Sequence, residues 1–307
     1  MPPKPSVFDH PRHSALAGSR GPFWSALGVA AAAVGCAPPG PQAPSGAVEA
    51  LREQRSVGAP LNTVLSLLRA STPSAPSAET STLAASTTPI WPLLVLVHGT
   101  PGSASAWSDY LLQPPVGLEV IALDRPGFGQ SGPPGAVTTL AGQAAAVAAL
   151  LPQDGRPVVL LGHSLGGPIV AQVAVDHPDR VTALVLLSAS LDPAQESIHP
   201  MQFVGAWPLV RSLLPRMLRN ANAELMALKP ELEALALRLP EIRAKVVIVH
   251  GTKDDLVPVA NVPFMQARLR GARCVKTVLL DGSNHFLPWN SADVVRAAIS
   301  QALEPGC

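Results

Sequence analysis

The stretch Val158-Val-Leu-Leu-Gly-His-Ser-Leu-Gly-Gly167 decides the fold of this chain. Its apolar, β-branched beginning predicts a buried strand, and the run from Pro168 to Val175 predicts the start of a helix. Between them stands Gly-x-Ser-x-Gly, the pattern of a nucleophile elbow when strand, tight turn and helix follow one another. We therefore expect Ser164 in a strained conformation, with Gly162 and Gly166 at points of close backbone approach.

The composition is that of one large α/β domain with appendages. The chain has 307 residues, of which 47% are hydrophobic and 14% charged, and a formal net charge of +1. This content is ample for a core, and the charge gives no electrostatic reason to expect nucleic acid or an anionic membrane as a partner. Many of the prolines precede residue 90, which favours a leader over a second domain.

Residues 1–36 are predicted to form a signal peptide. The uncharged run Phe23–Val34 follows a net basic stretch; it has the length of a signal-peptide apolar region and is short for a membrane span. The segment Ala33-Val-Gly-Cys36 resembles the lipobox of bacterial lipoproteins. That resemblance implies lipidation of Cys36 and a lipid-anchored protein of the bacterial cell envelope. The alternatives are a secreted protein whose cleaved signal merely contains Cys36, or a mistaken start site.

Residues 37–88 are expected to be a linker with short helices. Two short amphipathic helices broken at Pro60 are suggested by Val48, Leu51, Leu61, Val64, Leu65 and Leu68. The Ser/Thr/Ala/Pro-rich run from Ser71 to Pro89 indicates a flexible linker. Such a segment would tether a catalytic domain to a membrane while leaving it mobile.

The three cysteines, Cys36, Cys274 and Cys307, show no metal-ligand spacing and no disulfide framework. Cys274 and Cys307 could pair in an oxidising compartment, but the favoured interpretation is one small buried thiol and one loose terminal thiol. No metal or organic cofactor is expected.

From Leu93 onward, predicted strands alternate with predicted helices. Strands are expected at Leu93–Val97, Glu119–Leu123, Val158–Leu161, Ala183–Leu187, Val246–Val249 and Val275–Leu280. Helices are expected at Ala104–Leu112, Thr138–Leu151, Pro168–Asp176, Val259–Arg270 and Ser291–Leu303. This alternation predicts the α/β class, with a doubly wound, mostly parallel sheet covered by helices on both faces.

The interval Asp192–Glu241 is too long for a simple crossover between two strands, and it is apolar. It contains Met201, Phe203, Trp207, Leu209, Leu213, Leu214, Met217 and Leu218. We predict a helical lid here at the mouth of a site. A lid must bury one face against the body and can lend the remainder to a substrate.

Two further motifs follow the first two predicted strands, where sites of such sheets form. In His98-Gly-Thr-Pro-Gly102 the backbone N–H of Thr100 is placed to form an oxyanion hole together with that of Leu165. His98 is expected to hold this loop by a hydrogen bond rather than to act in catalysis. Asp124 and Arg125 are expected to fix the turn beside the site and to do no chemistry.

A base and an acid follow the last two predicted strands. His285 lies in a Gly/Ser/Asn loop from which an imidazole can reach Ser164, and a group of pKa near 6.5 suits a general base. A carboxylate after the preceding strand would orient that imidazole. Asp254 is the preferred residue, Asp255 is the close rival, and Asp192 is a weaker candidate.

Together these motifs resemble the α/β-hydrolase superfamily, in which serine, acid and histidine follow one another in this order. The resemblance covers about Pro89 to Pro305 and implies an α/β-hydrolase domain over residues 89–307, with Ser164, Asp254 and His285 as catalytic residues. Family members usually begin with a β-hairpin. Thr80–Thr88 is a poor match for one, so that edge of the sheet is shortened or the leader replaces the hairpin.

The expected function is that of a carboxylesterase-like or lipase-like serine hydrolase. It would cleave an ester-type bond of a small, hydrophobic substrate through an acyl-enzyme. Carbon–carbon hydrolase, thioesterase, aminopeptidase and cofactor-free peroxidase activities use the same residues and stay open. A different class, a non-catalytic envelope-anchored binding protein on the same fold, is the second hypothesis. The oligomeric state stays open.

Overall fold

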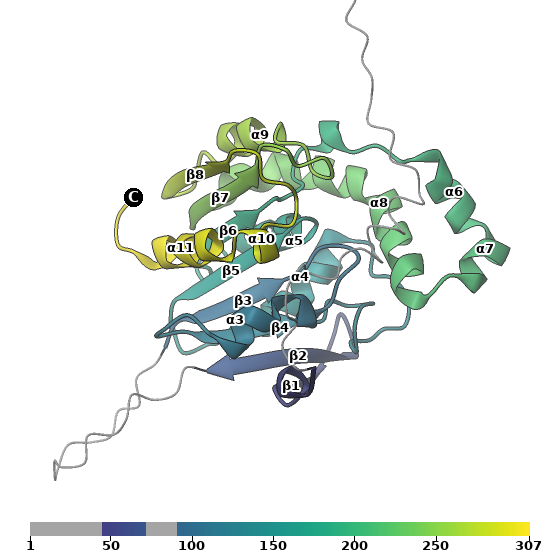
Figure 1. The fold of residues 1–307 in the computed structure, drawn as a ribbon, viewed down its shortest axis with the longest axis horizontal. Helices are drawn as coiled ribbons and strands as arrows, with labels where there is room; N and C mark the ends of the chain where they lie inside the picture. Colours follow the sequence, from purple (N-terminus) through teal and green to yellow (C-terminus); the bar gives the residue numbers. More distant parts are fainter. Residues whose placement is uncertain (1–44, 72–90) are drawn as a thin grey trace, which may run out of the picture.

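The structure is a computed structural model that describes residues 45–71 and 91–307 (Figure 1). The predicted signal peptide with its predicted lipidation site Cys36 lies outside these residues, as do residues 37–44 and 72–88 of the predicted linker. Across the two described ranges, no helix combines the length and the apolar character needed to cross a membrane.

One eight-stranded sheet forms the centre of the molecule. Its strands are β1 Arg52–Val57, β2 Thr63–Ser71, β3 Leu93–Val97, β4 Glu119–Leu123, β5 Val158–His163, β6 Ala183–Leu187, β7 Lys245–Gly251 and β8 Cys274–Leu280. They lie in the order β1-β2-β4-β3-β5-β6-β7-β8. β1 pairs antiparallel with β2, and β2 pairs antiparallel with β4, whereas every other pair is parallel. The predicted mostly parallel α/β sheet is confirmed.

Helices cover both faces of the sheet. One core contains residues of α4 Leu140–Ala148, α5 Gly166–Asp176, α8 Arg216–Arg238 and α9 Asn261–Arg268. The core on the opposite face contains residues of α3 Ser108–Leu112 and α11 Ala292–Leu303. Short helical segments lie at α2 Ser45–Glu49, η1 Ala104–Trp107, η2 Pro193–Gln195, η3 Leu239–Glu241 and α10 Leu287–Asn290. Because β3, β5 and β6 are buried along their whole length and β4 at every residue except Glu119, their side chains belong to both cores.

The first described segment corrects the predicted linker with short helices. After α2 the chain forms the hairpin β1–β2 and joins the sheet beside β4. β2 is buried on both faces, since Leu65 and Leu67 belong to one core and Leu68 and Ala70 to the other. Apolar residues on both faces of a strand obscure its period of two, so the spacing resembled that of a helix. Residues 52–71 thus supply the β-hairpin with which members of the resembled family usually begin.

Three helices are inserted between β6 and β7, within the interval expected to hold a lid. They are α6 Pro200–Ala206, α7 Pro208–Leu213 and α8. α6 and α7 each begin with a proline, a residue suited to the first turn of a helix. Figure 1 shows α6 to α8 on the side of the molecule toward which the parallel strands point. The helices therefore stand at the edge of the sheet where sites form.

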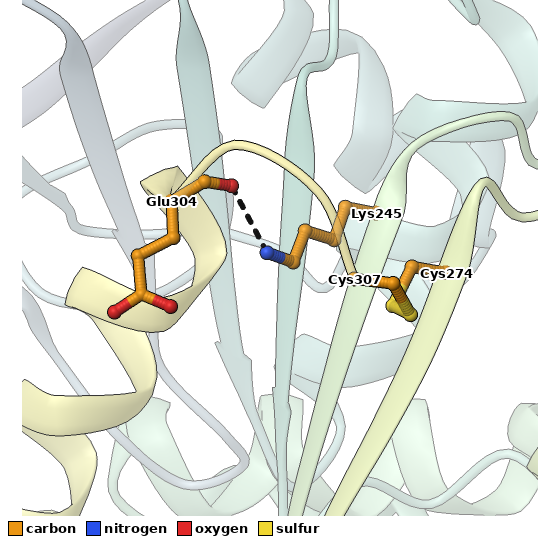
Figure 2. Close-up of a disulfide and its surroundings, with 4 residues drawn as sticks. All are labelled: Lys245, Cys274, Glu304 and Cys307. Atoms are coloured by element: carbon orange, nitrogen blue, oxygen red, sulfur yellow. Dashed lines mark hydrogen bonds between the residues drawn. A yellow bond between two sulfur atoms is a disulfide. The ribbon is translucent and has the colours of Figure 1, made fainter.

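The end of the chain is joined to the edge strand β8 by a disulfide between Cys274 and Cys307 (Figure 2). Beside it, the buried Lys245 ammonium donates a hydrogen bond to the carbonyl oxygen of Glu304 at 3.1 Å. The expectation of two free thiols is therefore wrong. The path of α11 across the sheet brings the two Cα atoms to 5.5 Å, within the usual range of a disulfide, and no sequence pattern reveals that path.

Candidate active site

Ser164 occupies the tight turn between β5 and α5. Its φ of 57° lies in the left-handed region, which is strained for a residue other than glycine. A Cβ at Gly162 would overlap the carbonyl oxygen of Gly166, and a Cβ at Gly166 would overlap that of Val97. Both glycines are therefore required by close backbone approach. The turn has the geometry of a nucleophile elbow, with Ser164 half-buried at its apex.

Asp254 and His285 form a buried pair after β7 and β8. The distance from His285 Nδ1 to Asp254 Oδ2 is 2.8 Å, and Asp254 Oδ1 accepts the backbone N–H groups of Leu256 and Val257 at 3.0 and 2.8 Å. Burial opposes ionisation of Asp254, but the hydrogen bond and the charge of His285 outweigh it. They hold the pKa of the carboxyl below its ordinary value. An ionised Asp254 fixes His285 with its proton on Nδ1 and leaves Nε2 as the acceptor.

The two rival carboxylates lie in other surroundings. Asp255 is exposed. The carboxylate of Asp192 caps η2 by accepting the N–H of Ala194 at 3.0 Å. Of the three candidates, Asp254 is the residue that contacts His285.

His163, the residue before Ser164, connects the elbow to the loop of His285. Its Nε2–H donates to the carbonyl oxygen of His285 at 3.0 Å, and the two ring centroids are 4.7 Å apart. Burial, with the nearby charge of His285, lowers the pKa of His163 to about 3, so the ring is neutral. Among the residues that the structure describes, no hydrogen bond joins the Ser164 hydroxyl to His285. His163 therefore links the turn of Ser164 to the backbone of the loop that carries His285.

His250, on β7, is a further buried histidine, and it lies outside the motifs that the sequence offers. Its Nε2–H donates to the carbonyl oxygen of Val257 at 2.9 Å, and Nε2 lies 3.6 Å from Asp254 Oδ2. Burial lowers the pKa of His250 as well. It supports the loop that carries Asp254. A histidine at the end of a buried strand has no sequence signature that would have revealed this role.

The loop after β3 lies against Ser164. A Cβ at Gly99 would stand 2.7 Å from Ser164 Cβ and 3.2 Å from its Oγ. Within the described part of the chain, the backbone N–H groups of Thr100 and Leu165 donate to no other residue. Buried backbone N–H groups are almost always paired. Two unpaired donors next to one serine suit a site that stabilises an anion.

His98 holds this loop, as the sequence predicts. The backbone N–H of Arg125 donates to His98 Nε2 at 3.1 Å, so the proton of the neutral ring is on Nδ1, and Nδ1–H donates to the carbonyl oxygen of Gly99 at 2.7 Å. Burial, aided by the charge of Arg125, holds the pKa of His98 well below its ordinary value.

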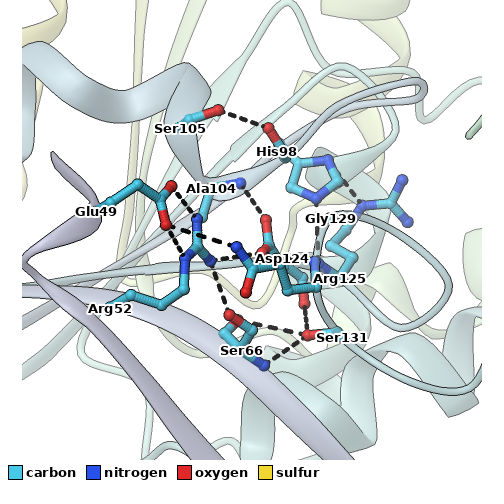
Figure 3. A network of polar contacts seen from close by, with 12 residues as sticks. Glu49, Arg52, Ser66, His98, Ala104, Ser105, Asp124, Arg125, Gly129 and Ser131 are labelled. Atoms are coloured by element: carbon cyan, nitrogen blue, oxygen red, sulfur yellow. Dashed lines mark hydrogen bonds and ion pairs between the residues drawn. The ribbon is translucent and has the colours of Figure 1, made fainter. Parts of the chain in front are cut away.

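Asp124 fixes the turn beside the site, again as predicted (Figure 3). Its buried carboxylate accepts the backbone N–H groups of Ala104 at 2.7 Å and Gln130 at 3.0 Å. It also pairs at 2.9 Å with Arg52 of β1. The N-terminal hairpin therefore helps to hold the loops around the site.

Arg125 points away from Asp124 and pairs with Glu224 of α8. The distances are 2.7 Å from Nη1 to Oε1 and 3.0 Å from Nη2 to Oε2, and both side chains are buried. Arg125 Nη2 also donates to the carbonyl oxygen of Gly99 at 3.0 Å. Glu224 is 99 residues from Arg125 in the sequence, and no pattern connects the two.

The strand order and the positions of the site residues together indicate a class of enzyme fold. An eight-stranded sheet in this strand order, with a serine elbow after β5, an acid after β7 and a histidine after β8, is the arrangement of an α/β hydrolase. Residues 92–211 match the family model described as alpha/beta hydrolase fold. The chain has the α/β-hydrolase fold. Among residues 45–71 and 91–307, no three His, Cys, Asp or Glu side chains are grouped so that they could hold a metal ion.

Two curated proteins are similar to this chain in sequence. The acetyltransferase component (dihydrolipoyllysine-residue) of the acetoin cleaving system of Cupriavidus necator is 32% identical over 199 residues, 55% of this chain and 53% of that protein. The chain thus matches about half the length of that relative. The pimeloyl-acyl-carrier-protein methyl ester esterase of Aeromonas hydrophila is 28% identical over 235 residues, 63% of this chain and 88% of the esterase.

Solved structures share the fold. The enol-lactonase from Burkholderia xenovorans LB400 superposes with a TM-score of 0.60 at 17% identity, covering 82% of this chain and 99% of that one. At this identity the likeness concerns the fold alone.

Proposed function

We propose that the protein is an enzyme of this superfamily, a serine hydrolase that cleaves an ester-type bond through Ser164, His285 and Asp254. The observation that carries the proposal is the buried pair of His285 Nδ1 and Asp254 Oδ2 at 2.8 Å, whose loop is bonded to the residue next to the strained Ser164. Ester hydrolysis also agrees with the activity named for the Aeromonas relative.

The reaction would proceed by acyl transfer to water. Ser164 Oγ attacks the ester carbonyl carbon while its proton passes to His285 Nε2, and the C=O π pair moves to the oxygen. His285 then gives that proton to the leaving alkoxide as the C–O bond breaks. Water repeats the sequence on the acyl-enzyme and releases the acid. The hydrogen bond between serine and histidine often tightens only when substrate is bound, which fits the absence of that bond between the described residues Ser164 and His285.

Thr100 and Leu165 would supply the oxyanion hole. Their backbone N–H groups flank Ser164, and the N-terminus of α5 begins one residue after Leu165. An ordered donor of this kind stabilises the transition state by about 3 kcal/mol, since it needs no reorganisation when the negative charge forms. Each donor is therefore expected to contribute about 100-fold or more to kcat.

A hydrophobic acyl or alkyl group is the substrate class we propose. The described helices α6 and α7 bury none of their side chains. They expose Phe203, Leu209 and Leu213, and Trp207, which joins the two helices, is exposed as well. Exposed apolar surface of this kind is typical of a binding site for a ligand or a partner. We propose that the inserted helices act as the lid and contribute this surface to binding of the substrate.

Labelling with a fluorophosphonate, followed by hydrolysis of p-nitrophenyl esters of increasing chain length, tests the proposal. The wild-type chain should be labelled and active. Ser164→Ala should lose the label and at least about 1,000-fold in kcat. Ser300→Ala, which alters an exposed serine on α11, is the matched control and should behave as wild type. Equal labelling of wild type and Ser164→Ala would reject Ser164 as the nucleophile. An unlabelled wild type, inactive on every ester, would favour the binding protein.

We also propose that the protein is exported and lipid-anchored through Cys36. The support is the lipobox-like segment ahead of the domain and the disulfide Cys274–Cys307, a bond that persists in oxidising compartments. Growth of the expressing cells with a labelled fatty acid should label the wild type and leave Cys36→Ser unlabelled. A mature wild-type protein without label would reject the anchor.

A further inference from the structure

Arg125 stands at a junction between the inserted helices and the loop beside Ser164. The two Nη atoms of its guanidinium make two hydrogen bonds to Glu224 of α8 and one to the carbonyl oxygen of Gly99, and its Nε lies 3.4 Å from His98 Nδ1. Arg125 is 0% exposed and Glu224 is 3% exposed. Gln143 of α4 donates a further bond to Glu224 at 2.8 Å. A buried charge pair is kept in place only where hydrogen bonds satisfy both partners, so this geometry is closely defined.

The carbonyl that Arg125 holds belongs to the peptide unit of the proposed oxyanion donor. The oxygen of Gly99 and the N–H of Thr100 are parts of one planar peptide, and in a trans peptide they point in opposite directions. Arg125 and His98 both donate to that oxygen, at 3.0 and 2.7 Å. Fixing the oxygen from one side therefore fixes the direction of the N–H on the other side. A cation on the oxygen also draws electron density from the amide and strengthens the N–H as a donor.

We infer that Arg125 is a positioning residue for the oxyanion hole, and that Glu224 makes its effect depend on the seating of α8. This inference rests on the proposed function. Arg125 touches no reacting atom; it orients and polarises the peptide whose N–H faces the oxyanion. When α8 is seated so that Glu224 pairs with Arg125, the peptide between Gly99 and Thr100 is therefore also held in the orientation that the oxyanion hole needs.

Arg216 of α8 contacts the chain after β4, the segment that also carries Arg125, and it offers a control. Arg216 donates to the carbonyl oxygens of Gly129, Ser131, Pro133 and Pro134. Like Arg125, it connects α8 to the chain after β4, but none of its described bonds reaches Gly99. Arg216→Lys and Arg125→Lys are therefore the same chemical change at two ends of one interface. Lysine keeps the charge but cannot span two carboxylate oxygens and a carbonyl.

The experiment compares wild type, Arg125→Lys and Arg216→Lys in three measurements: the thermal midpoint, kcat and KM for a p-nitrophenyl ester, and inhibition by an alkyl trifluoromethyl ketone. Ser164 Oγ adds to the carbonyl carbon of the ketone, and the hydroxyl proton of Ser164 passes to His285. The ketone oxygen then carries the negative charge of a hemiketal oxyanion. Arg125→Lys should lower kcat by about 10- to 100-fold, less than the loss of a whole donor. Arg125→Lys should lower the affinity for the ketone inhibitor by a similar factor, and it should change KM for the ester by less than about threefold.

Arg216→Lys should lower the thermal midpoint while kcat and the ketone affinity stay within about threefold of wild type. A folded Arg125→Lys with wild-type kcat and ketone affinity would overturn the inference. Equal losses in Arg125→Lys and Arg216→Lys would overturn it too, because they would reduce Arg125 to a structural contact.

If Arg125→Lys does not fold, the double variant Arg125→Met/Glu224→Leu decides the question. It removes both buried charges together, which proteins tolerate far better than loss of one partner. The same drop in kcat and in ketone affinity is expected, since the carbonyl oxygen of Gly99 still loses the guanidinium and keeps only His98 as a donor, and wild-type values would overturn the inference. Failure of the proposed function looks different: the wild type itself would hydrolyse no ester, and the inference would fall with it.

Discussion

Three histidines around the site, His98, His163 and His250, are buried, and burial lowers the pKa of each. In the unfolded chain each would bind a proton below its ordinary pKa of 6.5. Over that range the unfolded state binds more protons than the folded state, so the free energy of unfolding falls as the pH drops. For His163 the loss begins near pH 6.5 and continues down to its folded pKa of about 3.

We expect His163→Gln to reduce this pH dependence. Glutamine keeps an N–H donor for the carbonyl of His285 but does not titrate. One histidine contributes a slope of at most about 1.4 kcal/mol per pH unit. Urea unfolding of wild type and variant at pH 7, 6 and 5 measures the difference. Identical slopes in the two proteins would show that His163 takes up its proton in the folded state as readily as in the unfolded one.

At the residue scale, much of the site could be predicted because its parts follow predicted strands. Ser164, Asp254 and His285 follow β5, β7 and β8, and the structure puts Asp254 and His285 in contact. The sequence could not decide among neighbouring carboxylates, since loop geometry settles that. The pair of Arg125 and Glu224 depends on how a long helix is seated, and this is a property of tertiary packing.

At the scale of the elements, the parallel strands could be predicted closely. β3, β4 and β6 have the bounds expected from the sequence, because a fully buried parallel strand is a short, continuous apolar run. The hairpin could not be predicted. β1 reads Arg-Glu-Gln-Arg-Ser-Val and is mostly exposed, so it has no apolar pattern. β2 is buried on both faces and lacks a strict alternation.

The disulfide Cys274–Cys307 should stabilise the edge formed by β8 and the end of the chain. It closes a loop with a sequence separation of 33 residues, for which the loss of chain entropy in the unfolded state stabilises by up to about 3–4 kcal/mol. We expect dithiothreitol to lower the thermal midpoint of the wild type by about 5–10 °C. Cys307→Ser should have the lower midpoint already and should not respond to the reductant. A midpoint unaffected by both changes would mean that this bond adds no stability.

At the scale of the whole molecule, the hairpin that supports the site loops and the inserted helices occupy different parts of the sheet. One edge carries the N-terminal hairpin, whose Arg52 reaches the buried Asp124 beneath the site loops. The inserted helices α6 to α8 stand at the carboxyl ends of the parallel strands (Figure 1). α6 and α7 therefore stand at the same edge of the sheet as the turn of Ser164, which follows β5.

We expect polar substitutions on α6 and α7 to change chain-length preference and to spare the chemistry. Trp207 and Leu209 are 65% and 75% exposed, so Trp207→Ser and Leu209→Ser should cost little stability. If this surface binds acyl chains, KM for a long-chain ester should rise by about 10-fold per lost side chain, while values for an acetyl ester stay unchanged. Leu237→Ser, an exposed leucine near the end of α8, is the matched control. Parallel changes for long and short esters would argue against a role in substrate selection.

The buried bond between α8 and the chain after β4 sets a condition for engineering. Residues 192–241 look like a replaceable cassette, because they enter and leave the scaffold between two neighbouring strands. A chimera that exchanged this cassette for a foreign one would leave the Arg125 guanidinium buried opposite whatever residue took the register of Glu224. Grafts that preserve an acid at that register should yield working chimeras. Grafts that place a neutral side chain there would need a compensating change at Arg125 before any new specificity could be read out.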